Sequence, residues 1–204
     1  MTGPARSGPA LGHVLGTAVV CLALLAAGSW LQGWLPDDDA DPAAEPHVRA
    51  GGVGDALDLR TATVTVDEVR GTRRVEQYGT ELVSPGLWVV VGYTVVPTEE
   101  NATVTFAELE DGRGRTWGLV GRNANSCAES PPGVPVRCTV LMEVPADALP
   151  TLRLRLARLS RETRFDAVAE VDLGLTRDDA EGFATAPTYS VPAPELGDPP
   201  EEDS

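Results

Sequence analysis

Few residues in this chain have side chains that could carry out chemistry. All 16 basic residues are Arg, and the only two His, His13 and His47, precede the region that looks folded. A region without His and Lys lacks the groups for a Ser-His-Asp or Cys-His nucleophile, a His-ligated metal site or a Schiff base. No Gly-rich phosphate loop leads into a helix. We therefore expect no catalytic, cofactor-binding or metal-binding residue.

Cys127 and Cys138 are eleven positions apart and flank a proline-containing loop. In an oxidising compartment two such thiols are expected to form a disulfide, which here would pin a loop to a strand. A redox pair or a metal site is the alternative. It is disfavoured because the spacing is not C-x-x-C and no His lies nearby.

Three arginines, Arg153, Arg155 and Arg158, lie in the run LRLRLARL. If this run is a strand, the Leu side chains face the core, and Arg153 and Arg155 share the outward face. We interpret the three as a candidate interaction patch for an anionic partner. The alternatives are a helix over the same run, or an ordinary solvated face whose arginines pair with neighbouring acids. The acids considered for such pairing are Glu162, Glu170 and Asp172.

Glu108 and Glu110 would share one face of a strand. Glycosidases use a pair of carboxyl groups as their catalytic residues. They therefore supply the alternative function, a small cell-envelope hydrolase that uses a carboxylate pair. Alternate acids on a strand are far more often a solvated face. We favour a non-enzymatic binding module over this hydrolase.

The elements that would position these residues are short β-type runs separated by Gly, Pro and Asp. The run 87–96, LWVVVGYTVV, is apolar on both faces and is the best candidate for a central strand. Eight such runs predict an all-β protein, an immunoglobulin-like antiparallel β-sandwich of seven or eight strands over residues 57–177. The runs are 57–66, 69–78, 87–96, 102–109, 115–120, 134–144, 152–159 and 165–173.

Residues 11–35 contain no Asp, Glu, Lys or Arg, and they predict one transmembrane helix that precedes the sandwich. Arg6 precedes this run and four Asp follow it. Because basic residues next to a membrane helix are more frequent on its cytoplasmic side, we expect residues 1–10 in the cytoplasm and the domain outside. We therefore expect a single-pass plasma-membrane protein with an extracytoplasmic domain. The alternative is a signal peptide that is cleaved near Ala26, Ala27 and Gly28.

Acidic flanks surround the predicted domain. Residues 36–56 read as a Pro-rich acidic linker and residues 178–204 as a disordered acidic tail. The formal net charge of −15 lies mostly in these flanks, since residues 50–177 hold 18 acids and 14 Arg. This balance argues against nucleic-acid binding, which needs a basic surface.

Three segments carry a resemblance to a known family: GLWVVVGYTVV (86–96), AELEDGRGRTW (107–117) and VPVRCTVLMEVP (134–145). Together they resemble the telokin-like, immunoglobulin-like extracytoplasmic domains of unknown function found on lipoproteins and membrane-anchored proteins of GC-rich Gram-positive bacteria. The resemblance covers residues 58–175 and brings no catalytic residue. It implies an extracytoplasmic binding or interaction module. We expect this module to bind another envelope protein or a ligand.

Overall fold

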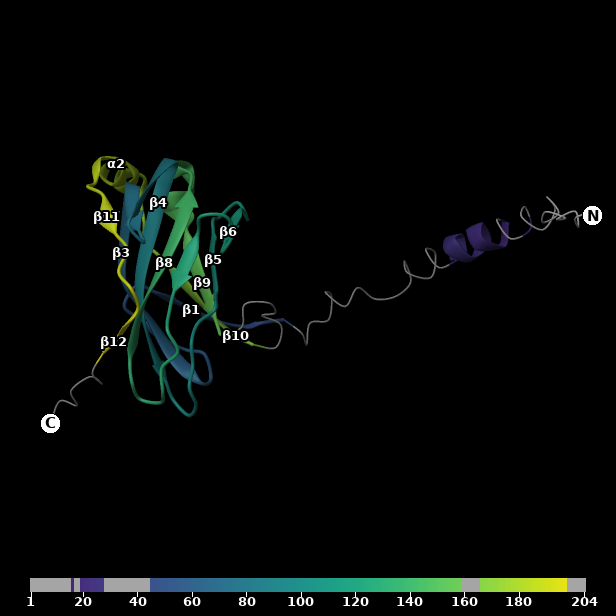
Figure 1. The fold of residues 1–204 in the computed structure, drawn as a ribbon, viewed down its shortest axis with the longest axis horizontal. Coiled ribbons are helices and arrows are strands. Elements are labelled where there is room, and N and C mark those ends of the chain that lie inside the picture. Colours follow the sequence, from purple (N-terminus) through teal and green to yellow (C-terminus); the bar gives the residue numbers. More distant parts are fainter. Residues whose placement is uncertain (1–15, 17–18, 28–44, 159–165, 198–204) are drawn as a thin grey trace, which may run out of the picture. The chain divides into compact units, whose positions relative to one another are not determined.

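The computed structural model describes residue 16 and residues 19–27, 45–158 and 166–197. The chain divides after Ala44 into two units, and the second contains all the described strands (Figure 1). The expected cytoplasmic segment 1–10, most of the expected transmembrane run and residues 198–204 lie outside the described residues. So does Glu162.

Two sheets form the second unit, which confirms the expectation of a mostly β, sandwich-type domain (Figure 1). The larger sheet has seven strands and the smaller sheet has five. The larger sheet runs β11 (Tyr189–Ser190), β3 (Ala62–Gln77), β4 (Thr80–Pro97), β8 (Val136–Val144), β12 (Glu195–Leu196), with β2 (Ala56–Asp58) paired to β3 and β7 (Ala124–Ser126) paired to β8. The smaller runs β1 (His47–Gly52), β10 (Ala167–Asp172), β9 (Arg153–Ala157), β5 (Phe106–Glu110), β6 (Thr116–Gly118).

The core lies between the two sheets. Val89 and Val91 of β4 contribute to it from the larger sheet, and Leu154 and Leu156 of β9 contribute from the smaller one. All four side chains are buried, and burying each contributes about 1.5–3 kcal/mol to the free energy of unfolding. A 3-10 helix, η3 (Ala146–Thr151), carries the chain from β8 in one sheet to β9 in the other.

The hairpin between β3 and β4 dominates the larger sheet. Its two strands turn through Tyr78 and Gly79, whose φ angles are both positive, at 51° and 74°. Since Gln77 pairs with Thr80, the loop is a two-residue turn, and positive φ at both loop positions is what such a turn needs to match the strand twist. Tyr78 is 91% exposed at the tip.

Several predicted strands are confirmed. The runs 87–96, 134–144, 152–159 and 165–173 correspond to β4, β8, β9 and β10. β5 and β6, which overlap the runs 102–109 and 115–120, pair with each other as an antiparallel hairpin. The strand alternative for LRLRLARL is therefore confirmed over the helix. Two expected strands, 57–66 and 69–78, prove to be mostly one long strand, β3, which keeps pairing with β4 across register shifts at Val66/Glu68 and Thr72/Arg74. Extra residues at such bulges disturb the side-chain alternation without ending a strand.

The sandwich is not purely antiparallel, and the described residues hold twelve strands where seven or eight were expected. β1 pairs in parallel with β10, and β11 pairs in parallel with β3. Both of these parallel strands, β1 and β11, come from the expected flanks. A parallel pair needs no hairpin between its strands, so segments far apart in the chain can form one.

The expected flank boundaries are therefore wrong in two places. The linker was expected to extend to residue 56, but His47–Gly52 form β1 and Ala56–Asp58 form β2. The tail was expected to be disordered from residue 178, but Arg177–Thr185 form a helix, α2, followed by β11 and β12. In both cases the backbone of a polar segment finds hydrogen-bond partners on the edge of a sheet.

Within the first unit, residues 19–27 are helical and every one of them is exposed. None of the helices in the described parts of the chain has both the length and the apolar character needed to cross a membrane.

Candidate functional site

The outer face of the smaller sheet carries two of the three predicted arginines, Arg153 and Arg155, whereas Arg158 reaches residues next to β3 and β4 of the larger sheet. Leu154 and Leu156 of β9 are buried in the core, while the Arg153 and Arg155 side chains alternate with them and are 56% and 22% exposed. Arg158 follows directly after the strand. The predicted alternation of this strand is therefore confirmed.

Each of the three arginines has an acidic partner. Arg153 Nη1 lies 3.1 Å from Glu170 Oε1, one of the acids named in advance. Arg158 Nη1 lies 3.0 Å from Glu100 Oε1 and also donates to Thr61 Oγ1 at 2.7 Å. These arginines are therefore paired with acids and do not form one free cationic patch.

Arg155 lies between the two acids of the alternative hydrolase. Its Nη1 is 3.4 Å from Glu108 Oε1 and 3.7 Å from Glu110 Oε2. Glu108 stands directly opposite Arg155 in the register of β5 and β9, so the contact follows from strand pairing. The two carboxylates are thus brought together, and they converge on a guanidinium group.

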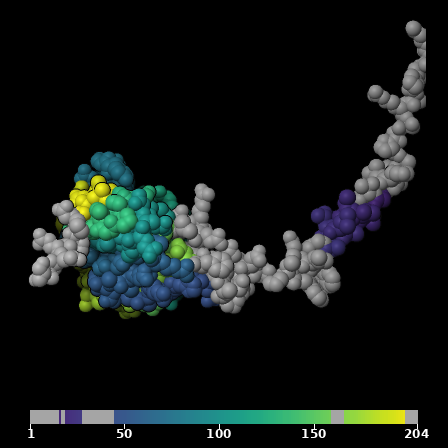
Figure 2. All heavy atoms as spheres, turned by 90° about the horizontal axis from the view of Figure 1, so that it is seen from below, coloured from purple at the N-terminus to yellow at the C-terminus, as the bar shows by residue number. Residues whose placement is uncertain are grey.

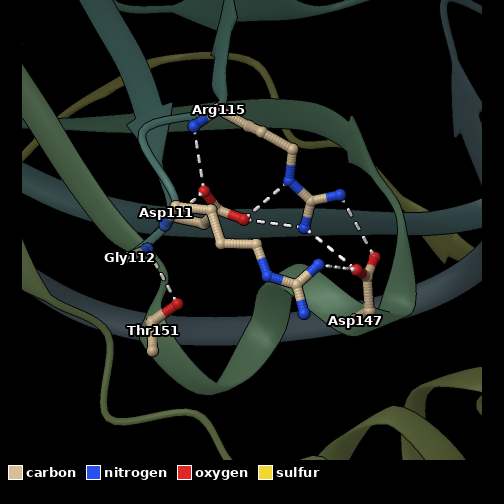
Figure 3. Close-up of polar contacts among 6 residues, drawn as sticks. Asp111, Gly112, Arg115, Asp147 and Thr151 are labelled. Carbon is tan, nitrogen blue, oxygen red and sulfur yellow. Dashed lines mark hydrogen bonds and ion pairs between the residues drawn. The ribbon is translucent and has the colours of Figure 1, made fainter.

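The β5–β6 turn holds a second polar cluster, centred on Asp111, whose side chain is only 2% exposed (Figure 3). Asp111 Oδ1 accepts hydrogen bonds from the backbone N–H groups of Arg113, at 3.0 Å, and Arg115, at 2.9 Å. Asp111 Oδ2 accepts from Arg115 Nε at 2.8 Å. Burial would raise the pKa of this carboxyl, but the hydrogen bonds from Arg115 and Arg113 outweigh burial and hold the pKa below its usual range.

The same turn is fastened to η3. Arg115 Nη2 lies 3.1 Å from Asp147 Oδ2, and Arg113 Nη1 lies 2.8 Å from the same oxygen (Figure 3). The Gly112 N–H donates to Thr151 Oγ1 at 2.8 Å. These contacts join the β5–β6 turn to η3, so their geometry gives the cluster a role in the fold.

Cys127 and Cys138 form the predicted disulfide, with Cα atoms 4.5 Å apart. Cys127 follows β7 and Cys138 lies within β8, so the bond pins a loop to a strand as expected. Closing a loop of this length contributes roughly 2–3 kcal/mol in the chain-entropy model. Cys21, by contrast, is a free thiol.

A small second core lies on the outer face of the larger sheet. Trp88 and Val90 of β4 point away from the main core and pack with Val75 of β3 and Leu141 of β8. Arg122 lies over the Trp88 ring, 5.1 Å from its centroid. This cluster explains why the run 87–96 is apolar on both faces.

A segment near the C-terminal end of the chain contacts both cores, through α2 at the main core and through Tyr189 and Val191 at this outer face. We call residues 176–197 the C-terminal arm; it comprises α2, β11 and β12 (Figure 1). Tyr189 and Val191 pack against the second core. Directly after α2, the carbonyl groups of Ala186 and Pro187 accept hydrogen bonds from Thr72 Oγ1, at 3.3 Å and 3.0 Å.

Hollows lie along the arm. One of about 440 Å³ is lined by Glu68, Thr94 and Arg137 of the sheet together with Tyr189 and Pro192 of the arm. Others, of about 290, 420 and 580 Å³, are also lined in part by arm residues. The larger sheet therefore presents a broad polar and apolar face that the arm only partly fills.

The sequence analysis missed this arm. Its one early signal is Thr176 followed by Asp179, because a hydroxyl residue with an acid three positions later is typical of a helix start. In the structure Asp179 Oδ2 accepts a hydrogen bond from the Thr176 N–H at 2.7 Å. Hydrogen bonds from Thr176 lower the pKa of Asp179.

No protein-family model and no curated protein matches the chain. Among solved structures, an uncharacterized β-sandwich protein from Clostridium difficile 630 is similar, with a TM-score of 0.43 and 8% identity over 63% of this chain and 95% of that one. The yjhA protein from Bacillus subtilis is similar with a TM-score of 0.44 and 14% identity, over 59% of this chain and 99% of that one.

Proposed function

We propose that this chain is a single-pass membrane-anchored protein that presents a non-enzymatic binding module outside the cytoplasm. In this proposal residues 11–35 hold the chain in the plasma membrane, and the sandwich binds another protein of the cell envelope. The sandwich is of immunoglobulin type and belongs with the telokin-like domains that segments 86–96, 107–117 and 134–145 resemble.

The observation that carries the proposal is the helix over residues 19–27. Its large apolar side chains are 59–71% exposed and are spread around the whole circumference of the helix. A helix that is apolar on all sides requires an apolar surrounding, and a bilayer supplies one. The large apolar side chains concerned are Val19, Val20, Leu22, Leu24 and Leu25.

The disulfide supports the extracytoplasmic placement of the domain. Disulfides form and persist in oxidising compartments and are rare in the reducing cytoplasm. The Cys127–Cys138 bond belongs to the second unit, which also contains both sheets. A domain that lies outside the membrane is consistent with Arg6 before the apolar run and Asp residues after it.

The charge arrangement supports a binding module over the hydrolase. A glycosidase pair needs one carboxyl group that can give a proton and one that is free to act on the substrate. Glu108 and Glu110 instead both contact Arg155 Nη1. No observation on the described residues favours the hydrolase.

The proposal is tested by protease treatment of intact protoplasts that express the full chain with different tags at its two ends. We expect the C-terminal tag to be lost and a small fragment with the N-terminal tag to be protected by the membrane. A C-terminal tag that survives until the cells are permeabilised would overturn the topology. Mature chain without the N-terminal tag would show a cleaved signal peptide instead of an anchor.

A paired variant tests the anchor itself. Leu22→Arg with Leu25→Arg should shift the chain from the membrane fraction to the soluble fraction, because each Arg near the centre of a spanning helix costs about 2.5–3.5 kcal/mol. The matched control, Leu22→Ala with Leu25→Ala, keeps the segment uncharged and should stay in the membrane fraction. Equal fractionation of the two variants would contradict the anchor.

A further inference from the structure

The outer face of the larger sheet has a hollow of about 440 Å³ beside the arm, and we call it the arm hollow. Part of its lining is a row across three strands, in which Glu68 of β3, Gly92 of β4 and Thr139 of β8 lie opposite one another in register. Tyr189 and Pro192 of the arm also line it. Figure 2 shows the yellow C-terminal end of the arm on the surface of the domain. The arm hollow is therefore bounded by the sheet and by the arm.

Gly92 leaves the floor of the arm hollow open. It lies inside a central strand, where glycine lowers stability and often marks the close approach of a ligand. Packing does not require glycine here, since a Cβ atom at position 92 would meet Glu68 Cβ at 3.5 Å, which is an ordinary contact. What glycine supplies at this position is space above the sheet.

Two side chains of β8 bring hydrogen-bond donors to the arm hollow. Thr139 is only 7% exposed, and its hydroxyl has no hydrogen-bond partner among the described residues. A buried hydroxyl without a partner costs free energy, so a ligand group that bonds to it gains affinity. Arg137 is the next outward-facing residue of β8, and it too has no ion-pair or hydrogen-bond partner within the part of the chain that the structure describes.

Two acids bring hydrogen-bond acceptors to the same place. Glu68 Oε1 accepts a hydrogen bond from Arg70 Nε. Glu68 Oε2 accepts none from the described residues, and it lies 3.9 Å from where a Cβ atom of residue 92 would be. Asp67 Oδ2 accepts from Thr94 Oγ1 at 2.6 Å, and both residues line the arm hollow. Each acid is thus held by a neighbour through one oxygen and keeps the other oxygen for a ligand.

Tyr189 gives the arm hollow an aromatic surface. Arg70 Cζ lies 5.7 Å from the centroid of the Tyr189 ring, so the residue that pairs with Glu68 also orients this ring. A tyrosine side chain has an apolar ring and a polar hydroxyl. It can therefore contact both the C–H groups and the hydroxyl groups of one ligand.

We propose that the arm hollow binds a saccharide, as a mono- or disaccharide portion of an uncharged glycan. Sugar hydroxyl groups both donate and accept hydrogen bonds, and the arm hollow offers donors on β8 and acceptors on its two acids. The C–H groups of a sugar ring match the aromatic ring of Tyr189. A volume of about 440 Å³ lies within the range of small-molecule sites.

The charges of the arm hollow favour an uncharged ligand. One arginine and two acids line it, so a ligand with a net charge of either sign would meet a like charge. A zwitterion such as a short peptide would need an acid for its ammonium group, but Glu68 already pairs with Arg70 and Asp67 already bonds to Thr94. The inference rests on neither the membrane anchor nor a protein partner, because every residue that it uses lies in the second unit.

The test is ligand-observed saturation-transfer NMR on the full chain, solubilised in a detergent whose headgroup is not a sugar. The probes are cellobiose, maltose and N,N′-diacetylchitobiose, with alanylalanine and acetate as the zwitterionic and anionic comparisons. We expect at least one disaccharide to bind with a dissociation constant of about 1 mM or lower. We expect that neither alanylalanine nor acetate binds or displaces the sugar.

Thr139→Val is the sharpest variant, because it removes the hydroxyl and keeps the branched shape. Since that hydroxyl has no partner among the described residues, the free energy of unfolding should not fall, whereas sugar binding should weaken about three- to tenfold. The matched control is Thr63→Val. Thr63 of β3 is also half-buried on the outer face but does not line the arm hollow, so this variant should leave sugar binding unchanged.

Gly92→Val tests the space itself. Its methyl groups would occupy the floor of the arm hollow, and valine suits a strand, so this variant should fold and lose detectable sugar binding. Arg137→Gln should weaken sugar binding about tenfold or more, because a charged donor makes the stronger hydrogen bonds.

Three results would each overturn the proposal. The first is that none of the three disaccharides binds, and the second is that alanylalanine displaces the sugar, which would show a peptide site. The third is sugar binding that neither Thr139→Val nor Gly92→Val weakens, because the sugar would then lie elsewhere. None of these results bears on the protease topology of the chain, so failure of this proposal is distinguishable from failure of the membrane anchor.

Discussion

Phe183 of α2 lies directly against the backbone of Gly71 in β3. A Cβ atom at position 71 would come within 1.9 Å of Phe183 Cδ2. The aromatic ring therefore occupies a notch that exists only because residue 71 is glycine. This contact fastens the beginning of the C-terminal arm to the sheet.

Gly71→Ala should displace Phe183 and loosen the arm. We expect a loss of about 1–3 kcal/mol in the free energy of unfolding, which is the usual cost of forcing an extra methyl group into a packed contact. Hydrogen exchange should become faster in α2 and in β11. The measurement is urea unfolding combined with exchange resolved along the chain.

The matched control for this prediction is Gly182→Ala. Gly182 neighbours Phe183 in α2, and a Cβ atom there would meet nothing within 4 Å. Alanine favours a helix over glycine by roughly 0.8–1.0 kcal/mol, so this variant should be slightly more stable. An equal loss of stability in the two variants would show that the arm does not depend on the notch.

The contact between Gly71 and Phe183 is an example of a feature that a single sequence does not predict. Strands such as β4, β8 and β9 follow from local periodicity, because apolar residues alternate or run together over several positions. The role of Gly71 depends on Phe183, far along the chain, and no local pattern links them. The arm itself is rich in Pro and acid, so its composition resembles a disordered tail, and only pairing with β3 and β8 gives it structure.

The candidate site, too, can be predicted from the sequence only in part. Side chains alternate between the two faces of a strand, and this alternation predicts that Arg153 and Arg155 point outward. Glu170 is among the acids that the sequence analysis considers as ion-pair partners. The contact of Arg155 with Glu108 and Glu110 was not foreseen, because it requires β5 to lie beside β9 in one register. Register between distant strands is set by long-range packing, which a single sequence does not reveal.

Replacing Arg153, Arg155 and Arg158 together with Gln should leave the fold intact. An exposed ion pair such as that of Arg153 contributes about 0.2–1 kcal/mol, and the half-buried Arg155 and Arg158 pairs should contribute somewhat more each, so we expect a loss of stability. That loss should shrink as salt is added, because salt screens the pairs that the variant lacks. Urea unfolding at low and high ionic strength measures it.

The same triple variant tests the interaction patch. If these arginines dock an anionic partner, capture of that partner should weaken, most of all at low salt. A folded variant that keeps every partner at low ionic strength would place the docking site elsewhere.

Breaking the disulfide should destabilise the sandwich. Cys127→Ser with Cys138→Ser should lower the free energy of unfolding by roughly 2–3 kcal/mol through the lost restraint on the unfolded chain. Reduction of the native protein should have the same effect. Cys21→Ser is the control and should leave the stability of the domain unchanged. A domain equally stable with and without the bond would contradict the prediction.

Asp111 should make the stability of the domain depend on acid pH. Its pKa is lowered in the folded state, so its contribution is fully present above the ordinary Asp pKa of about 3.9 and is lost as the pH falls through the lower folded value. Asp111→Asn should be less stable than the native protein at neutral pH, and the difference should narrow in acid. Unfolding curves at neutral pH and below the ordinary Asp pKa measure this. A difference that stays constant with pH would show that the charge of Asp111 is not what holds the turn.

Tyr93 should act at the opposite end of the pH scale. Its hydroxyl is buried in the core and donates to Asn125 Oδ1 at 2.7 Å, while Asn125 Nδ2 donates to the Val104 carbonyl at 2.9 Å. Burial raises the pKa of Tyr93 well above its ordinary value, although the hydrogen bond to Asn125 opposes this. The folded protein therefore keeps Tyr93 neutral at a pH where the unfolded chain ionises it.

This difference predicts that the native protein loses stability as the pH rises above the ordinary Tyr pKa of about 10. Tyr93→Phe should cost about 1 kcal/mol at neutral pH, because Asn125 loses its donor, and its stability should fall less steeply at alkaline pH. Tyr78→Phe is the matched control, because Tyr78 is 91% exposed and should change neither quantity. The prediction is tested by measuring the free energy of unfolding of each variant at pH values below and above the ordinary Tyr pKa. A Tyr93→Phe variant that loses stability with pH as steeply as the native protein would show that another group controls the alkaline limit of the fold.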